Sequence, residues 1–204
     1  MNCVPKSISP CIETLKAVNG KTQHLAWHQA RFDKTRRELY GDTSKMFLSE
    51  MIQAPSKGEY RVRIEYADTL LKVEYFPLHV RTFERFALVE TDINYAYKYA
   101  NRESLNALKP SSVDDVIFTC NGELKDTSIA NIALCLDGVW LTPKNPLLKG
   151  TTRERLLCGG FLKDAILTTK HLQKASKFAI MNAIIGFKTL ETFEYSREIG
   201  RAHV

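Results

Sequence analysis

The sequence of 204 residues has no apolar run that approaches the length of a membrane span, and it does not open with a charged and apolar signal peptide. Its five cysteines are an odd number, scattered between Cys3 and Cys158 without a C-x-x-C pair. Zinc-binding and redox motifs are therefore unsupported, and reduced thiols are expected. These absences predict a cytoplasmic protein that neither enters a membrane nor depends on disulfides.

Metal and nucleic-acid sites also lack support in the sequence. His24 and His28 are four residues apart, but no acidic residue stands in the H-E-x-x-H register, so we expect no metal site. The net charge is +6, yet lysine and arginine are dispersed, and no basic run is interleaved with aromatic residues. This balance favours an anionic small molecule over a nucleic acid as the partner.

The hydrophobic share of 44% and the charged share of 25% are those of an ordinary globular protein. Alternating polar and apolar residues predict strands, and the turn signals between them predict hairpins. The strongest of these signals are the dipeptides Asn19-Gly20, Asn121-Gly122 and Asp137-Gly138. Much of the chain is therefore expected to be β-structure.

Helical spacing predicts a helix over residues 26–41 and a second over 42–52, with Asp42 or Thr43 as the cap of the second. We expect an α+β fold of two lobes, an N-terminal lobe over residues 1–92 and a strand-rich lobe over residues 93–197. The last seven residues, 198–204, read EIGRAHV, which is the in-frame translation of a common sequencing adapter. We assign no function to them.

A further helix is expected after the loop that Gly150 closes in NPLLKGTTRERLL, residues 145–157. Either Thr151 or Thr152 is suited to cap it. The first amides of a helix lack partners within the helix, so its start attracts anions. The same residues therefore suit either a plain helix start or a phosphate site, and this stretch alone does not decide between them.

Four short stretches occur in order along the chain: HQAR (28–31), YKYANR (97–102), DTSIANI (126–132) and LLKGTTRERLL (147–157). Together they resemble the fold-type IV pyridoxal-phosphate enzymes, a family that contains the class IV aminotransferases and 4-amino-4-deoxychorismate lyase. They match the family's H-x-x-R helix, its K-x-x-N region, its E-x-x-x-x-N strand and its glycine loop before a helix. The resemblance implies a two-lobed fold like that of D-amino-acid aminotransferase, with pyridoxal phosphate between the lobes.

The resemblance implies that Lys98 holds the cofactor as a Schiff base and moves a proton between Cα of the substrate and C4′. A different alignment, to K-x-x-N-Y, would use Asn94 and would leave Thr91 where the lysine belongs. We prefer the alignment on Lys98, because it keeps both the asparagine and the arginine of the motif.

The remaining cofactor contacts are also implied by the resemblance. Asp126 takes the place of the family's glutamate, which pairs with the pyridinium nitrogen, and it is one methylene shorter. Arg31 takes the place of the phosphate-binding arginine, whose guanidinium donates hydrogen bonds to two oxygens of the phosphate. The residues expected to line the cofactor are Ser128, Ile129, Leu148, Gly150, Thr151 and Thr152.

The family's substrates carry carboxylates, so a cation is expected to face the cofactor. We choose Arg63 for this role and expect Arg61 to lie on the opposite, solvated face of its strand. Asn182 and Ala183 belong to a stretch that resembles the late loop of the family, and we expect them to contact the substrate.

We predict a pyridoxal-phosphate-dependent class IV aminotransferase that acts on an anionic amino acid and forms a homodimer. The alternative is 4-amino-4-deoxychorismate lyase, which releases pyruvate and 4-aminobenzoate from an aminated chorismate and which the K-x-x-N-R form resembles more. A second alternative is a relative that binds the cofactor without catalysis. A keto-acid acceptor separates the first two activities, because only transamination needs one.

Overall fold

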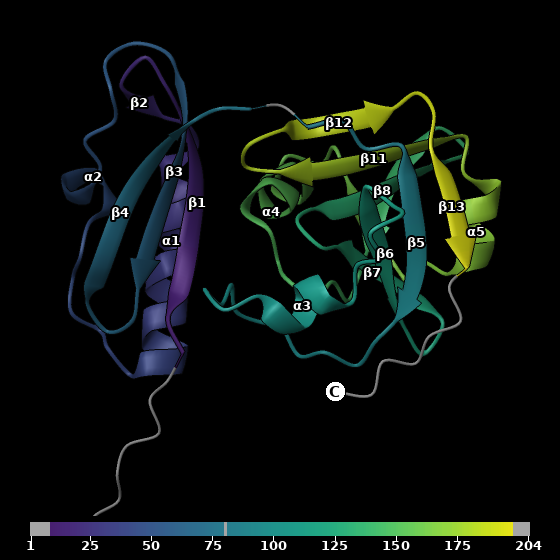
Figure 1. The fold of residues 1–204 in the computed structure, drawn as a ribbon, viewed down its shortest axis with the longest axis horizontal. Coiled ribbons are helices and arrows are strands. Elements are labelled where there is room, and N and C mark those ends of the chain that lie inside the picture. Colours follow the sequence, from purple (N-terminus) through teal and green to yellow (C-terminus); the bar gives the residue numbers. More distant parts are fainter. Residues whose placement is uncertain (1–8, 80, 198–204) are drawn as a thin grey trace, which may run out of the picture. The chain divides into compact units, whose positions relative to one another are not determined.

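The computed structural model describes residues 9–79 and 81–197, and the chain divides into two compact units. The first unit holds the described residues up to Leu78 together with Tyr97–Asn101. The second holds the other described residues (Figure 1). Residues 198–204, to which the adapter interpretation applies, lie outside the described residues.

The first unit is a four-stranded antiparallel sheet with helices on one side (Figure 1). Its strands have the order β2-β1-β3-β4. They are β1 (Cys11–Val18), β2 (Lys21–Thr22), β3 (Glu59–Tyr66) and β4 (Leu70–Pro77). The helical elements are α1 (Leu25–Thr35), the π-helical turn η1 (Arg36–Tyr40) and the short α2 (Leu48–Met51). The expected helix up to residue 41 is thus present, and a left-handed Gly41 ends it.

Strand alternation builds the core of the first unit. Cys11, Glu13, Leu15 and Ala17 point to one face of β1 and are buried. The apolar members of this set pack with Phe32 of α1 and with apolar residues of β3. Because Glu13 has the same parity as these residues, the sheet buries a carboxyl group beneath the helix.

The expected helix over residues 42–52 is wrong for its first half, since only Leu48–Met51 is helical. Asp42 does not cap a helix: its carboxylate accepts a hydrogen bond from the Ser44 amide at 2.7 Å and pairs with the Arg36 guanidinium. Arg36 also donates to the carbonyls of Ser44, at 2.8 Å, and Asp68, at 3.2 Å. A buried arginine thus fixes two loops and keeps the segment after Gly41 extended.

The second unit is built on a nine-stranded sheet with the order β10-β9-β8-β7-β6-β5-β13 along its main path. Strand β11 pairs with both β8 and β12. The strands are β5 (Arg85–Glu90), β6 (Asp115–Cys120), β7 (Glu123–Thr127), β8 (Asn131–Leu136), β9 (Val139–Pro143), β10 (Lys163–Ala165), β11 (Lys177–Asn182), β12 (Gly186–Leu190) and β13 (Glu194–Arg197). The helices are α3 (Glu103–Ala107), α4 (Thr151–Cys158) and α5 (Thr169–Lys174).

Local turn chemistry explains the hairpins, and the structure confirms the three dipeptide turns. In each of them both residues have positive φ, as in Asn19 (47°) followed by Gly20 (79°). That conformation suits asparagine, aspartate and glycine, and its twist matches the flanking strands. The sequence-predicted mixture of helix and strand is therefore present.

Two segments belong to a different unit from the lobe that the sequence suggested. Strand β5 pairs in parallel with β6 and with β13, so it is part of the second unit. The segment Tyr97–Asn101 is part of the first unit, where the carbonyl of Lys98 accepts a hydrogen bond from the Ile12 amide at 2.8 Å. In the described part of the chain, no helix is long and apolar enough to cross a membrane.

Replacing Arg36 by methionine should reduce the free energy of unfolding of the first unit by about 3 kcal/mol, because it leaves two loop carbonyls and Asp42 without their buried donor. Urea unfolding followed by circular dichroism measures this loss. Arg37→Met is the matched control, since its side chain is exposed one position further along the chain. Equal midpoints for the two variants would contradict the assigned role of Arg36.

Candidate active site

The tight hairpin between β7 and β8 places an acidic residue beside an amide. Asp126 and Asn131 are paired across the two strands. The hydroxyl of Thr127 accepts hydrogen bonds from the amides of Ile129, at 3.3 Å, and Ala130, at 3.0 Å, which fixes the turn. The spacing D-x-x-x-x-N thus has a structural basis: its two ends face each other at the base of one turn.

The side chain of Asn131 joins this hairpin to the loop before α4. Its amide nitrogen donates to Asp126 Oδ1 at 2.7 Å and to the carbonyl of Leu148 at 2.8 Å. The Leu148 amide in turn donates to Asp126 Oδ2 at 2.9 Å. A Cβ on Gly150 would lie only 2.1 Å from Asn131 Oδ1, so only glycine fits there. Sequence analysis did not include Asn131 among the site residues, although it closes this network.

Burial makes Asp126 an unusual carboxyl group. Its side chain is 4% exposed, and the loss of solvent raises its pKa to about 6. The hydrogen bonds from Leu148 and Asn131 and the charge of Arg153 act in the opposite direction. A buried carboxylate of this kind gains from a cationic hydrogen-bond donor, such as a protonated ring nitrogen.

Helix α4 begins immediately after this network. The expected threonine cap is wrong: Gly150 is the N-cap residue and makes no side-chain capping bond, so Thr151 and Thr152 lie inside the first turn. Both threonines are buried, at 6% and 4% exposure. First-turn amides lack partners within the helix and favour an anion. The structure thus brings Leu148, Gly150 and the two threonines together with Asp126.

The turn that carries Ser128 and Ile129 is held from both sides. The Ser128 amide donates to Asp115 Oδ1 at 3.2 Å, and its carbonyl accepts from the guanidinium of Arg102. The Ile129 carbonyl accepts from the side-chain nitrogen of Asn182 at 3.2 Å. Asn182, expected in the substrate site, therefore lies beside a residue expected to line the cofactor.

Asn182 also shapes its own loop. Its side-chain oxygen accepts hydrogen bonds from the amides of Ile184, at 2.9 Å, and Ile185, at 3.0 Å. These bonds fix the turn between β11 and β12, which carries the half-buried Ala183. The two substrate candidates of the late loop are thus placed by backbone hydrogen bonds, and their contact with a substrate stays a prediction.

In the first unit, Arg31 is oriented by a buried carboxylate. Its Nε donates to Glu13 Oε1 at 2.7 Å and its Nη2 donates to Glu13 Oε2 at 2.6 Å. His28, one turn earlier on α1, lies with Nδ1 2.7 Å from the same Oε2. Glu13 is completely buried, and Arg31 is 14% exposed. The H-x-x-R motif thus serves to place both side chains on one carboxylate.

Glu13 is a site residue that the sequence analysis missed. Burial acts to raise its pKa, but the charge and hydrogen bonds of Arg31, together with His28, outweigh it and hold the pKa at about 2. The carboxylate therefore stays ionised and keeps the guanidinium in one orientation. An available signal was its parity in CIETLKAV, which puts an acidic residue on an apolar strand face.

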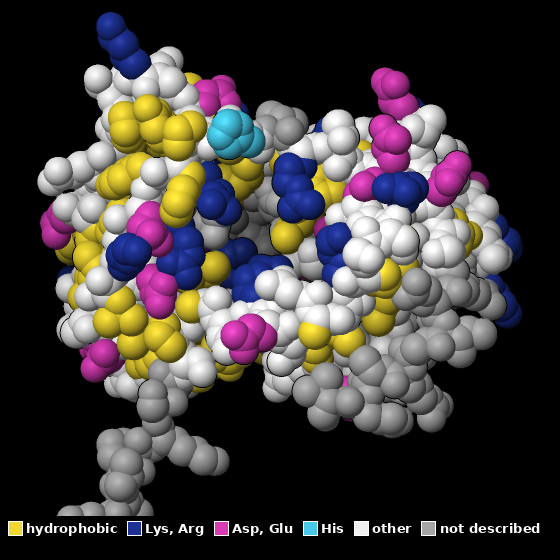
Figure 2. Space-filling view, viewed as in Figure 1, with side chains coloured by type: hydrophobic (Ala, Val, Ile, Leu, Met, Phe, Trp, Pro, Cys, Tyr) yellow, Lys and Arg dark blue, Asp and Glu magenta, His cyan; other side chains and the backbone are white. Residues whose placement is uncertain are grey.

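The expectation that Arg61 and Arg63 face opposite ways is wrong. Side chains two residues apart on a strand lie on the same face, and here that face is the one opposite the core. Arg63 pairs with Glu65 at 2.7 Å and with Glu74 at 3.1 Å, while Arg61 lies over the ring of Phe76. In Figure 2, basic and acidic side chains adjoin one another among hydrophobic ones on the visible face of the first unit.

Arg31 and Arg63 are consequently not brought together by the first unit. Arg31 bonds to Glu13 on the face of the sheet that packs against α1, whereas Arg63 lies on the other face. Two carboxylates already neutralise Arg63, so a substrate carboxylate would have to compete with them. Lys98, also in the first unit, is half-buried in the segment after Tyr97.

The donor set fits the cofactor that the sequence motifs imply. In the second unit, the buried carboxylate of Asp126 lies near the start of α4. Gly150 is required there because any Cβ would clash with Asn131. In the first unit, Glu13 holds the guanidinium of Arg31, a group of the kind that binds phosphate. Pyridoxal phosphate needs these groups: an acceptor for its ring nitrogen and donors for its phosphate.

Comparisons with known proteins agree with the motifs. Residues 93–188 match the family model described as amino-transferase class IV. An uncharacterised protein of Haemophilus influenzae is 32% identical over 185 residues, which cover 87% of this chain and 98% of that protein.

Solved structures are similar over most of the chain. A protein of Haemophilus somnus 129pt, provisionally named a 4-amino-4-deoxychorismate lyase, superposes with a TM-score of 0.80 and 26% identity, covering 87% of this chain and 97% of that one. A hypothetical aminotransferase from Mycobacterium tuberculosis, in its PLP-bound form, gives a TM-score of 0.75 at 15% identity and covers 92% and 82%. The second likeness concerns the fold alone.

Gly150→Ala should lower the affinity for pyridoxal phosphate by about tenfold or more, because the new methyl group displaces Asn131 and with it Leu148 and Asp126. Titration of the cofactor-free protein, followed by absorbance, measures the affinity. Gly159→Ala is the control at the other end of α4, where a Cβ would meet its nearest neighbour at 3.4 Å. Unchanged affinity in Gly150→Ala would show that the contact does not matter.

Asp126→Asn should change how the stability of the cofactor-free protein depends on pH. An ordinary aspartate has a pKa near ~3.9, so a folded value of about 6 means that the folded state binds the proton more tightly. Ionisation then costs stability as pH rises from about 4 to about 6, by up to ~3 kcal/mol. This decrease should be absent in Asp126→Asn and present in Asp92→Asn, an exposed control. Parallel urea-unfolding profiles for the three proteins would refute the assignment.

Proposed function

This chain belongs to the class IV aminotransferase family, and from that premise we propose that it is a pyridoxal-phosphate enzyme that moves the amino group of an anionic amino acid. The observation that carries the proposal is the network of Asp126, Asn131 and the loop that ends at Gly150. It places a buried carboxylate and the first turn of α4 in one compact unit. An ordinary helix start needs neither the carboxylate nor the obligatory glycine.

The cofactor, when bound, supplies an electron sink that stabilises negative charge at the substrate Cα. Asp126 would hold the proton on the ring nitrogen, and the first turn of α4 would bind the phosphate through its amides and threonine hydroxyls. Arg31, held in place by Glu13, would bind the same phosphate with a guanidinium that can donate two hydrogen bonds at once. These groups bind and orient, and none of them needs to move during the reaction.

We assign the proton transfer to Lys98. Its amine would hold the cofactor, be released by the incoming substrate amine, and then remove the proton from Cα. Delivery of that proton by Lys98 to C4′, followed by hydrolysis, would complete the first half of transamination, and a keto-acid acceptor would be needed for the second half. The hydrogen bond from the Ile12 amide to the Lys98 carbonyl anchors the backbone from which this side chain extends.

The second candidate is 4-amino-4-deoxychorismate lyase. It is favoured by the arginine of K-x-x-N-R and by the 26% identity to the Haemophilus somnus protein over nearly its whole length. In this chain that arginine, Arg102, bonds to the carbonyl of Ser128, so it has a definite place beside the turn that follows Asp126. The lyase reaction would use the same Lys98 and the same cofactor contacts, followed by loss of pyruvate.

The proposal includes a homodimer and an anionic substrate, an amino acid or an aminated chorismate. Of the substrate candidates, Asn182 is supported by its bond to the Ile129 carbonyl, which puts it next to the cofactor-lining turn. Arg63 has less support than it had from the sequence, because Glu65 and Glu74 already pair with it.

Borohydride reduction of the protein with pyridoxal phosphate should attach the cofactor covalently to Lys98. Lys98→Ala should prevent this labelling and lower turnover by at least ~10²-fold, since it removes both the amine and the general base. Peptide mass spectrometry locates the label, and Lys34→Ala, an exposed lysine of α1, is the control. Equal labelling of Lys98→Ala would refute the proposal.

The same protein then distinguishes the two reactions. Transamination should need a keto-acid acceptor, and 4-aminobenzoate should form from aminated chorismate without one if the chain is the lyase. Activity is measured with and without the acceptor in wild type and Lys98→Ala.

A further inference from the structure

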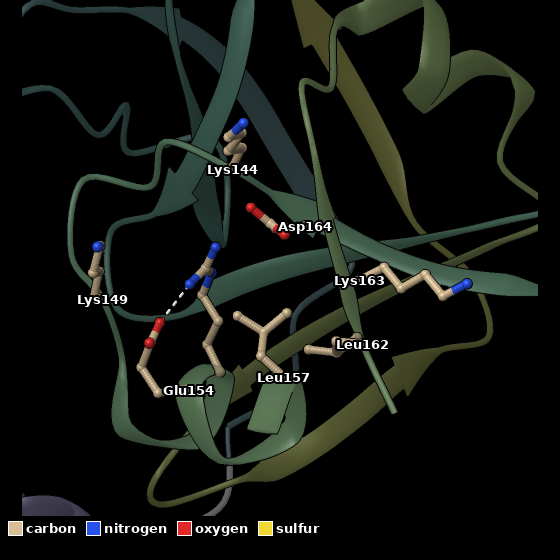
Figure 3. Close-up of a pocket in the computed structure, with 8 residues that line it drawn as sticks. Lys144, Lys149, Glu154, Leu157, Leu162, Lys163 and Asp164 are labelled. Carbon is tan, nitrogen blue, oxygen red and sulfur yellow. Dashed lines mark hydrogen bonds and ion pairs between the residues drawn. The ribbon is translucent and has the colours of Figure 1, made fainter. Parts of the chain in front are cut away.

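A cavity of about 610 Å³ lies beside α4, and all of its lining residues belong to the second unit (Figure 3). Its walls come from the end of β9, from β10, from α4 and from the residue before the Gly150 cap. Four cations line it, Lys144, Lys149, Arg153 and Lys163, together with the two carboxylates Glu154 and Asp164. This volume is in the range of small-molecule pockets.

None of the residues that line the cavity is a proposed cofactor contact, although the charge of Arg153 acts on Asp126. Arg153 and Leu157 are four residues apart and so share one face of α4, whereas Lys149 lies in the loop before the N-cap residue Gly150. Thr151 and Thr152 are not among the lining residues. The start of α4 thus adjoins two sites. The proposed function uses Thr151 and Thr152, and the cavity involves other residues of the helix.

Two cations at the cavity form no ion pair in the described part of the chain, although the carboxylates of Glu154 and Asp164 also line it. Within residues 9–79 and 81–197, no carboxylate forms an ion pair with Lys144 or Lys149. Figure 3 places Lys144 above Asp164 and Lys149 on the opposite side from Lys163, whose ammonium extends away from the others. An anion that entered the cavity would therefore meet unpaired ammonium groups.

Arg153 adds a buried and incompletely bonded cation. Its side chain is 3% exposed, its Nη1 pairs with Glu154, and its Nη2 donates to the carbonyl of Pro143 at 2.8 Å. Its Nε is buried without a hydrogen-bond partner in the described structure. A buried donor left unsatisfied costs free energy that an acceptor would restore.

We propose that this cavity binds a small organic phosphate monoester. A phosphate carries nearly two negative charges at neutral pH and three strong acceptor oxygens, which suits the ammonium groups of Lys144 and Lys149 and the positive charge of Arg153 at the cavity wall. Leu157 and the buried Leu162 supply an apolar wall for the organic part. The volume exceeds what a bare phosphate needs, which favours an ester over the inorganic ion.

Phenyl phosphate is a probe with this chemistry. Titrated into the protein loaded with pyridoxal phosphate and followed by calorimetry, it should bind one equivalent. Lys144→Ala/Lys149→Ala should weaken binding by about tenfold, since two charge-assisted contacts are lost. Lys170→Ala/Lys174→Ala makes the same change of charge on α5, away from the cavity, and should leave affinity unchanged.

Further measurements keep the outcomes distinct. Benzyl alcohol, which has the ring without the phosphate, should not bind, and amide NMR shifts on wild type should cluster at the lining residues. No binding of phenyl phosphate, equal weakening by both double variants, or equal binding of benzyl alcohol would overturn the proposal. Failure to take up pyridoxal phosphate would refute the proposed function. Titration of the two double variants without the cofactor would then still decide on the cavity, because only Lys144→Ala/Lys149→Ala removes cavity residues.

Discussion

The side-chain amide of Asn131 is the interaction on which the candidate site depends. It joins a hairpin to a loop seventeen residues away and fixes the orientation of the Asp126 carboxylate. It also fills the space that any side chain at position 150 would need. The position of the acid and the start of α4 are therefore set together, and neither is free to shift without the other.

The first unit follows the same physical logic with different residues. A buried carboxylate, Glu13, is tolerated because Arg31 and His28 satisfy it, and in return it holds the guanidinium in place. In both units the groups assigned to the cofactor are thus supported by a partner that was not recognised as part of the site. The proposed function assigns its chemistry to Asp126, Arg31 and Lys98, and the residues that support Asp126 and Arg31 decide whether those two side chains are preorganised.

The sequence predicted what depends on neighbouring residues and failed where distant partners decide. Dipeptide turns such as Asn19-Gly20 form through local backbone preferences, so the hairpins were predictable. The prediction of a helix over 42–52 was wrong for its first half because Asp42 pairs with Arg36. Helix propensity takes no account of such a tertiary contact. Glu13 was missed because its partners are 15 and 18 residues away, and the faces of Arg61 and Arg63 were misassigned against the two-residue period of a strand. The candidate site came from motifs, from which we assigned Asp126 and the loop before α4 to the site but not Asn131, which joins them.

Nitrogen NMR of bound pyridoxal phosphate, isotope-labelled at the ring nitrogen, tests the central claim most directly. The account predicts a protonated ring nitrogen in the wild-type protein and loss of that proton in Asp126→Asn, because the buried carboxylate is its partner. An unprotonated nitrogen in the wild type, or the same signal in both proteins, would contradict the assignment of Asp126 to the cofactor.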